Sequence, residues 1–220
     1  MIKVAIDGPA GAGKSSIAKA VAKQLGFVYI DTGAMYRAVA VYAIENGIEI
    51  SEKTLSHDIL DKIEIDISYD ENGQKIFLCG KDVSERIRMS DASVGASNVA
   101  VIPAVRIKLV ELQRNLAEKS SVIMDGRDIG TYVLPNAEVK IFLTASVEER
   151  AKRRYLEMQE KGIEGDFDQV KKDIEYRDKN DSERKFAPLR QAEDAVLVDS
   201  SDMSIDEVTE RITEIIKGAM

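Results

Sequence analysis

A short apolar run followed by a glycine-rich segment limits most strongly what this chain can fold into. Residues 2–6 read IKVAI, and residues 8–16 read GPAGAGKSS. The apolar run predicts a buried strand, and the spacing of apolar residues after the glycines predicts a helix over Ser15–Leu25 that ends at Gly26. A strand, a glycine loop and a helix in this order are typical of an α/β protein with a parallel sheet.

The glycine loop fits the pattern G-x-x-x-x-G-K-[ST]. Glycines allow backbone N–H groups to converge on an anion, and the start of the helix and the lysine add positive charge. The strand before the loop and the helix after it favour nucleotide phosphate binding over a glycine-rich turn with a chance lysine. The residues predicted to hold the phosphates are Gly8, Pro9, Ala10, Gly11, Ala12, Gly13, Lys14, Ser15 and Ser16.

A second segment, SVIMDGRDIG at residues 121–130, predicts a metal partner for this loop. Val122–Met124 is an apolar strand that leads into Asp125. A carboxylate at the carboxyl end of a neighbouring strand is where a partner of Mg²⁺ would lie, although Asp-Gly also forms plain turns. We therefore predict a Mg²⁺ site at Ser15 and Asp125, and leave open whether Ser15 or Ser16 contacts the metal.

The remainder of the chain alternates between strands and helices, with one interruption. Further strands are expected at residues 27–30, 121–124, 139–143 and 195–198. Further helices are expected at residues 34–45, after a turn at 31–33, and at 84–89, 92–99, 103–119, 147–161, 167–179 and 205–217. Residues 63–80 alternate polar and apolar side chains around Glu71-Asn72-Gly73, which predicts an antiparallel hairpin on the main sheet. The whole predicts one α/β domain with a hairpin-bearing insertion and a helical flap.

Composition argues against several other classes of protein. The net charge is −8 over 220 residues, which disfavours general binding to nucleic acid. Cys79 is the single cysteine, so no internal disulfide can form and a thiolate metal site is not expected. The N-terminal apolar run is short for a signal peptide, and no apolar stretch reaches the roughly 18 residues of a membrane span. We expect a soluble, cytoplasmic protein.

Arginine placement narrows the class of phosphate-loop protein. A switch GTPase should carry an Asn-Lys-x-Asp guanine reader, which the sequence lacks. Several arginines instead lie in predicted turns and helix starts, among them Arg37, Arg106 and Arg127, and arginine pairs well with phosphate. Arg150, Arg153 and Arg154 share one face of a predicted helix by their spacing, and Arg177 and Arg184 flank Asp181. This number of arginines suggests that two phosphorylated substrates meet at the loop.

Longer blocks of sequence carry a family resemblance. They read DGPAGAGKSS, DTGAMYRAVA, GRDIGT with PNAEVKIFLTAS, and ERAKRR through RDKNDSER to APL and VDSS. In order from about residue 3 to about residue 216, these blocks resemble bacterial cytidylate kinases. One departure is that many nucleoside monophosphate kinases have Gly-Lys-Gly-Thr in the loop, where this chain has Lys14-Ser15-Ser16.

The resemblance implies a three-layer P-loop NTPase fold with a parallel central sheet, a small antiparallel hairpin-bearing insertion and a helical lid. The implied core comprises about residues 1–32, 90–146 and 190–220. The monophosphate-binding region with the hairpin comprises about 33–89, and the lid about 147–185.

The implied reaction transfers the γ-phosphoryl group of ATP to CMP or dCMP, with Mg²⁺ as cofactor. The implied acceptor-binding residues are Thr32, Arg37, Ser97, Arg106, Arg127, Asp128, Arg177, Asp181 and Arg184. Within this set, Ser97, Arg106 and Asp128 match cytosine-reading positions, and a carboxylate suits the exocyclic amine of cytosine. The implied catalytic residues are Lys14, Arg127, Arg153 and Arg177.

The partners expected are small-molecule substrates, with no membrane and no nucleic-acid polymer, and the protein is expected to be a monomer. Two alternatives stay open at this point. One is another small-molecule phosphate-loop kinase that acts on UMP, AMP or a sugar acid. The other is a binding protein that uses ATP as a switch.

Overall fold

The computed structural model describes residues 1–70, 73–160 and 162–220. The chain forms two compact units, one of residues 1–29 and 120–220 and the other of residues 30–119. The core, the monophosphate-binding region and the lid are functional regions, which this division into compact units does not test. Their boundaries stay predictions.

The first unit is built on a parallel sheet. The strands are β1 (Lys3–Asp7), β2 (Val28–Asp31), β6 (Val122–Gly126), β7 (Val139–Thr144) and β8 (Val196–Asp199). Their order across the sheet is β2-β6-β1-β7-β8. The chain passes into the second unit within β2. β1 pairs in parallel with β6 and β7, and β7 pairs in parallel with β8. The parallel central sheet predicted from the sequence is therefore confirmed.

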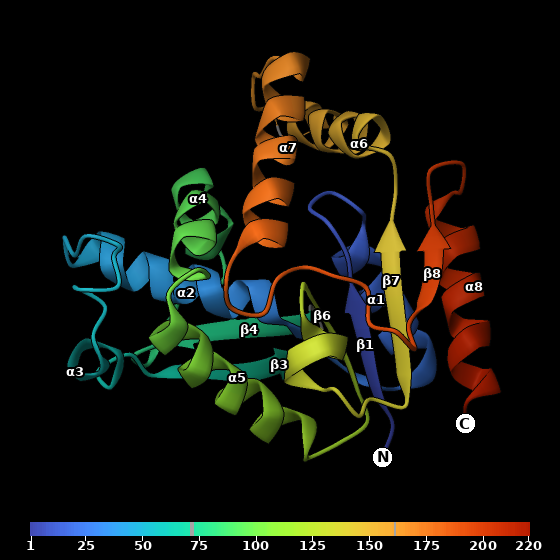
Figure 1. Cartoon of the computed structure of the whole chain (residues 1–220), viewed down its shortest axis with the longest axis horizontal. Coiled ribbons are helices and arrows are strands. Elements are labelled where there is room, and N and C mark those ends of the chain that lie inside the picture. The colour runs from blue at the N-terminus through green and yellow to red at the C-terminus, as the bar shows by residue number, and fades with distance from the viewer. Residues whose placement is uncertain (71–72, 161) are drawn as a thin grey trace. The chain divides into compact units, whose positions relative to one another are not determined.

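Helices α1 (Lys14–Leu25) and α8 (Ile205–Gly218) pack against each other and against this sheet (Figure 1). α8 begins with a capping box in which Ser204 and Glu207 satisfy each other's backbone N–H groups. The buried side chains between these helices and the strands include Ile6, Ile17, Val21, Ile141, Leu143 and Ile212. This core fixes the carboxyl end of β1, from which the glycine loop leaves the sheet.

Two further helices of this unit, α6 (Val147–Glu160) and α7 (Phe167–Glu183), pack on each other around Ala151, Val170 and Ile174. α6 follows the carboxyl end of β7 (Figure 1). The sequence prediction ended α7 at Lys179, and this was wrong by four residues. Its last turn carries a buried carboxylate, Asp181, whose ion pair stabilises helix beyond the point that local propensity supports.

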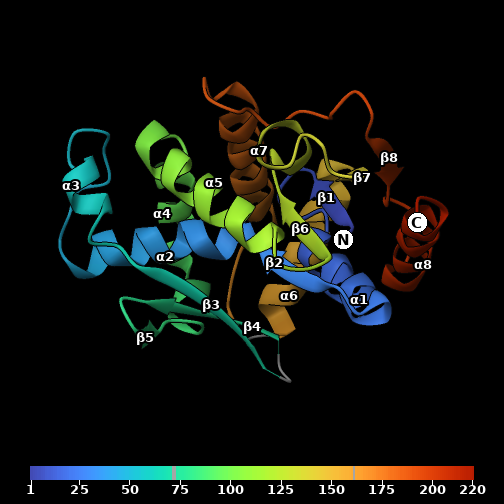
Figure 2. The ribbon, with the colours of Figure 1, turned by 90° about the horizontal axis from the view of Figure 1, so that it is seen from below.

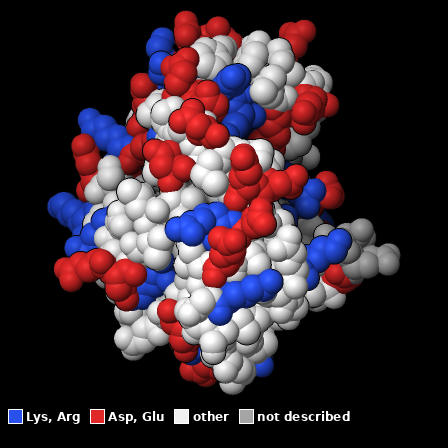
Figure 3. Space-filling model, turned by 90° about the vertical axis from the view of Figure 1, so that its right-hand side faces the viewer, with Lys and Arg blue, Asp and Glu red and all other residues white. Residues whose placement is uncertain are grey.

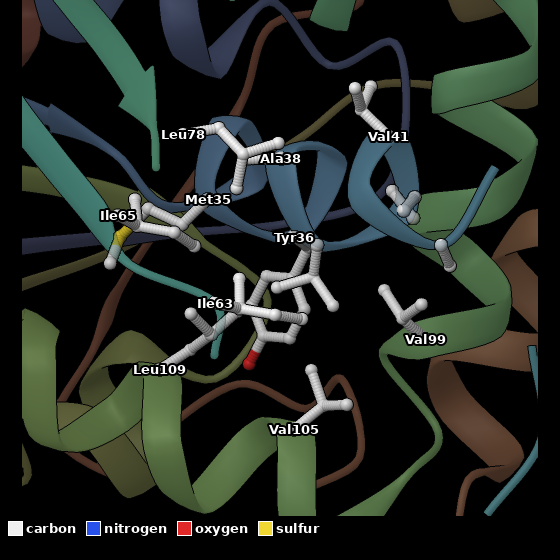
Figure 4. Close-up of a cluster of buried hydrophobic side chains, with 14 of the residues drawn as sticks. Met35, Tyr36, Ala38, Val41, Ile63, Ile65, Leu78, Val99, Val105 and Leu109 are labelled. Carbon is white, nitrogen blue, oxygen red and sulfur yellow. The ribbon is translucent and has the colours of Figure 1, made fainter. Parts of the chain in front are cut away.

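The second unit has its own hydrophobic core. Its helices are α2 (Thr32–Glu45), α3 (His57–Leu60), the 3₁₀ helix η1 (Arg86–Arg88), α4 (Ser90–Val99) and α5 (Pro103–Ala117). Figure 4 shows side chains from α2, α4, α5 and the hairpin gathered in one cluster. Those labelled include Met35, Tyr36, Ile65, Leu78, Val99, Val105 and Leu109. Residues 30–119 therefore bury a core of their own.

The predicted hairpin is present in the second unit. β3 (Ile65–Asp70) and β4 (Gly73–Leu78) pair antiparallel from Ile65 opposite Leu78 to Asp70 opposite Gly73. A short strand that the sequence did not predict, β5 (Lys81–Asp82), pairs with β4, and Figure 2 shows these strands beside α2. They form a separate sheet and do not join the main sheet. Glu71 and Asn72 of the predicted turn lie outside the described residues.

Two local predictions in the second unit were wrong. The expected turn at residues 31–33 is the start of α2, with Asp31 as the N-cap that accepts a hydrogen bond from the Ala34 N–H at 2.9 Å. The expected helix at residues 84–89 is reduced to the single turn η1. Ser84 instead accepts a bond from the backbone N–H of Ile76 in the hairpin, which holds this segment away from a helical path.

Acidic and basic side chains are interspersed on the face of the molecule that Figure 3 shows. This pattern differs from the continuous basic surface that binds nucleic-acid backbones. Among the described residues, no single helix is long and apolar enough to span a membrane, and one bent pair, α4 with α5, would pass on length and composition alone.

Candidate active site

The glycine loop connects the end of β1 to the first residue of α1. Gly13 is the N-cap of α1 and has φ of +83°, in the left-handed region that favours glycine. The backbone N–H groups of the first helical turn have no partner inside the helix, and they face the loop. The geometry is that of an anion-binding helix start.

Lys14 lies folded over this loop. Its side chain is buried, and its Nζ donates to the carbonyl oxygen of Pro9 at 2.7 Å. Burial, followed by the positive charge of Arg127, lowers the pKa of Lys14 to about 7, although Asp125 and Asp181 oppose this shift. An anion bound in the loop would restore the ordinary pKa, so the site favours a ligand with negative charge.

Asp125 lies in β6, next to β1 in the sheet, and contacts the start of α1. Its Oδ2 accepts the hydroxyl of Ser15 at 2.7 Å, and its Oδ1 accepts the hydroxyl of Tyr29 at 2.9 Å. The structure thus brings together the two residues that the sequence proposed as a metal pair. Tyr29 was not predicted from the sequence.

The donor set of this pair suits Mg²⁺, which prefers oxygen ligands and keeps places for substrate phosphates. Ser15 offers an exposed hydroxyl at the loop, and Asp125 holds that hydroxyl through a buried carboxylate. Within the described ranges, no group of three or more His, Cys, Asp or Glu side chains forms a candidate metal cage. A Mg²⁺ site that starts from Ser15 and Asp125 and is completed by substrate phosphate oxygens is consistent with this donor set.

Asp7, at the end of β1, helps to shape the site and was not predicted from the sequence. It is 4% exposed, and its two carboxylate oxygens accept the backbone N–H groups of Ile129 and Gly130, each at 2.7 Å. These residues begin the short π-helix η2 (Ile129–Val133), directly after Asp128. Burial raises the pKa of Asp7 to about 6, against the two N–H bonds, which lower it. A carboxylate at the end of an apolar strand was the only sequence signal for this role.

We expect the stability of the protein to report the titration of Asp7. The carboxyl has a pKa of about 6 in the folded protein, against an ordinary value of 3.8, so the folded state binds more protons between these values. The free energy of unfolding therefore loses a contribution as pH rises through this window, on the order of 3 kcal/mol. Asp7→Asn mimics the neutral acid and lacks this titration.

The measurement is urea unfolding of both proteins at several pH values between about 4 and 7. The difference in unfolding free energy, wild type minus Asp7→Asn, should fall as pH rises. A difference that stays constant over this range would contradict the assignment.

Arg127, on the loop after β6, faces the last turn of α7. Its Nε donates to Oδ2 of Asp181 at 2.7 Å, and its Nη1 donates to the carbonyl of Gly126 at 3.2 Å. Burial lowers the pKa of Arg127, but Asp181 and other nearby carboxylates outweigh it and raise that pKa above its ordinary value. Burial raises the pKa of Asp181, but Arg127, Arg184 and Arg177 outweigh it and lower that pKa. The site therefore keeps these groups charged.

Asp128 and Arg184 form a second buried pair. Nη2 of Arg184, the C-cap residue of α7, donates to Oδ1 of Asp128 at 3.1 Å, and both side chains are at least nine-tenths buried. Nε of Arg184 also donates to the carbonyl of Ala187 at 2.7 Å. Asp128, which follows Arg127 on the same loop, is thus held against the end of α7.

The three arginines of α6 diverge, although the sequence places them on one helical face. Arg150 is buried against the glycine loop, with Nη1 donating to the carbonyl of Ala10 at 2.9 Å. Arg153 donates to Oγ of Ser200 at 3.1 Å, and its Nη1 lies 4.0 Å from where a Cβ on Gly13 would be. Arg154 is exposed and pairs with Glu157. Arg150 and Arg153 adjoin the loop.

Four of the predicted acceptor-binding residues lie in the unit of residues 30–119. Arg37 pairs with Asp31 at 2.9 Å. Arg106 is 1% exposed, donates from Nη1 to the carbonyl of Ala100 at 3.2 Å and lies with its guanidinium 5.5 Å from the ring centre of Tyr36. Thr32 is the buried first residue of α2, and Ser97 is half-buried on α4.

Comparison with known proteins places this geometry in a family context. A sequence model described as cytidylate kinase matches residues 4–218. The chain is 52% identical over 214 residues to a cytidylate kinase of Caldicellulosiruptor bescii, covering 97% of this chain and 95% of the relative. It is 50% identical over 217 residues to a cytidylate kinase of Lactobacillus johnsonii, covering 99% of this chain and 94% of the relative.

A solved structure shares the fold. An uncharacterized protein from Eubacterium ventriosum aligns with a TM-score of 0.55 and 17% sequence identity, covering 99% of this chain and 98% of its own. At this identity the likeness concerns the fold alone.

Proposed function

The chain belongs to the cytidylate kinase family, and from this premise we propose that it transfers the γ-phosphoryl group of ATP to CMP or dCMP, giving ADP and CDP or dCDP. The observation that carries the proposal is the convergence of Lys14, Asp125 and Arg127 at a glycine loop, in a chain half identical to proteins named cytidylate kinase.

The ATP phosphates bind in the loop Gly8–Ser16. Backbone N–H groups at the start of α1 and the Nζ of Lys14 supply the donors, and Lys14 exchanges the carbonyl of Pro9 for phosphate oxygens. Arg153, on α6 near Gly13, adds positive charge on the lid side. The lowered pKa of Lys14 shows that burial disfavours its charged form. A bound triphosphate would compensate for this burial by placing negative charge beside the lysine.

We assign Mg²⁺ to Ser15 and Asp125, with Ser15 as ligand and Asp125 as the carboxylate that orients it. When bound, Mg²⁺ neutralises the negative charge that develops on the β- and γ-phosphate oxygens.

The transfer itself needs alignment more than proton chemistry. The attacking group is a phosphate oxygen of CMP, whose second pKa is about 6, so most of it is dianionic at neutral pH without a base. Catalysis then comes from holding the two phosphates in line and offsetting their charge. We assign this role to Lys14, Arg127, Arg153 and Arg177. The positive charges of Arg127 and Arg177 both lower the pKa of Asp181, whose carboxylate holds Arg127 directly.

For the acceptor base, we assign Asp128 to the exocyclic amine of cytosine. A carboxylate has about four acceptor positions, so Asp128 can accept the amine while it holds Arg184. Uracil presents a carbonyl in place of the amine and would leave Asp128 facing another acceptor. Asp181 and Arg184 serve the sugar and base. From the second unit we assign Thr32, Arg37, Ser97 and Arg106 to the acceptor, as the resemblance implies.

Asp128→Asn tests the base assignment. We expect the ratio of kcat/KM for CMP to that for UMP to fall by about 10-fold to 100-fold, because the amide no longer discriminates between an amine and a carbonyl. The KM for ATP, measured in the same variant, serves as the internal control and should change little. Full preference for CMP in the variant would show that Asp128 does not recognise the base.

One experiment tests the proposed function as a whole. ADP formation from ATP is followed in a coupled assay with CMP, dCMP, UMP and AMP in parallel. We expect turnover with CMP and dCMP well above that with UMP or AMP. Preference for UMP or AMP would point to another small-molecule kinase, and slow hydrolysis that no monophosphate accelerates would point to an ATP-dependent binding protein.

We further propose that the enzyme acts as a monomer in the cytoplasm on small-molecule substrates. The exposed thiol of Cys79 suits a reducing compartment. Light scattering coupled to gel filtration tests the proposed monomeric state, because it measures the molar mass in solution and a dimer would have twice the mass of one chain.

A further inference from the structure

An ion pair between a buried arginine and a partly buried aspartate joins the two lid helices, and the proposed function gives this pair no role. Nη1 of Arg150 on α6 lies 2.6 Å from Oδ2 of Asp178 on α7. The Arg150 side chain is 5% exposed and that of Asp178 is 23% exposed. Neither composition nor spacing singles out Asp178 among the charged residues of α7.

Both members of the pair also bind the glycine loop, and they bind it at the same residue. Arg150 donates to the carbonyl of Ala10 at 2.9 Å, and the N–H of Ala10 donates to Oδ1 of Asp178 at 3.3 Å. Both backbone polar groups of Ala10 are thus engaged from outside the loop. The Nε of Arg150 donates to the carbonyl of Ala145, which anchors the guanidinium to the end of β7.

Gly11, next to Ala10, also packs closely against α6. A Cβ on Gly11 would lie 3.2 Å from Cβ of Arg150 and 3.3 Å from its carbonyl oxygen. The loop backbone therefore lies directly against α6 at this point. A guanidinium buried this deeply needs its carboxylate partner, because removing one member of a buried pair leaves an uncompensated charge.

The contact also links the loop to the helix that carries the proposed phosphate-transfer groups. Asp178 follows Arg177 in α7, and Asp181 lies one helical turn later. A displacement of α7 large enough to move Arg177 and Asp181 must move Asp178, and with it one of the two bonds that hold Ala10.

We propose that Asp178, together with Arg150, is a positioning residue for phosphoryl transfer: it holds Ala10–Gly11 in the nucleotide-binding conformation and fixes α7 to the phosphate loop. The inference rests on the proposed function for its catalytic part. A loop held in its bound conformation before ATP arrives loses less conformational freedom on binding. A loop released from this contact presents its N–H groups with altered geometry, and a displacement of about 1 Å can lower turnover about 10²-fold.

Asp178→Asn provides the test. We expect ATP to bind about tenfold more weakly by calorimetry, and kcat/KM for ATP to fall by up to about 10²-fold. The matched control is Glu157→Gln, which breaks the exposed pair with Arg154 on α6 and should leave both values within about twofold of wild type. Calorimetry needs no acceptor, so this arm stands even if CMP proves not to be the substrate.

A second variant separates positioning from folding. Arg150→Met with Asp178→Asn removes both charges together, so no isolated buried charge remains and the melting temperature should stay close to that of wild type. We expect this folded protein to keep the weakened ATP binding of Asp178→Asn. Wild-type ATP affinity in both variants would overturn the proposal, as would an affinity loss that merely follows the unfolded fraction.

Discussion

Replacing Lys14 by methionine lowers kcat for phosphoryl transfer by about 10²-fold or more, because the transition state loses a positive charge placed at the transferred phosphate. The methionine side chain is of similar length and uncharged, so it removes a buried charge and leaves the fold intact. The coupled assay with ATP and CMP measures the loss, and circular dichroism confirms folding. Near-normal turnover in the folded variant would refute the assignment of the loop.

Lys23→Met is the matched control, since Lys23 lies on the same helix with its side chain in solvent. A second readout uses the pKa of Lys14, about 7 in the protein without nucleotide. At about pH 8 most of this lysine is neutral, and bound phosphates raise its pKa, so ATP binding takes up a proton. Calorimetry in buffers of different ionisation enthalpy should show this uptake in wild type and not in Lys14→Met.

Replacing Gly8 by alanine lowers the free energy of unfolding by about 3 kcal/mol or more. Gly8 has φ of +153°, and a Cβ there would lie 1.9 Å from the carbonyl oxygen of Leu143. That oxygen belongs to the backbone of β7, so strand and loop must both move to make room. For a chain of this length, the melting temperature should fall by about 10 °C, measured by calorimetry.

The control for Gly8 is Gly218→Ala. Gly218 lies at the end of α8, where an added Cβ meets no atom within 4 Å. Alanine is a better helix former than glycine, so this variant should be as stable as wild type or slightly more stable. Equal melting temperatures for the two variants would mean that the contact between Gly8 and Leu143 is relieved without strain.

The elements that the sequence predicted well are those fixed by local pattern. The strand, loop and helix over residues 2–25 follow from residue spacing alone, and Asp125 was identifiable because it ends an apolar run. The start of α2 was mistaken for a turn because Asp31 uses the same chemistry in both settings. An aspartate that accepts a backbone N–H close after it in sequence suits a turn or a helix N-cap.

The site contacts that the sequence could not predict join residues far apart in the chain. Asp178 meets Ala10 across 168 positions, and Arg127 meets Asp181 across 54. No periodicity encodes such pairs, because they depend on how α7 returns to the loops at the end of the sheet. The family resemblance implies a site role for Asp181, but its ion pair with Arg127 is visible only in the structure.

The pairing of arginines with carboxylates at the site has a consequence for how substrates are selected. Arg127, Arg150 and Arg184 each lie against a carboxylate, so at these positions opposite charges largely cancel at a distance. Long-range attraction from these side chains, and the acceleration by low ionic strength that it brings, is correspondingly small. Discrimination among cellular anions then falls to the last few ångströms of approach, where a phosphate must match donors that carboxylates already hold in position.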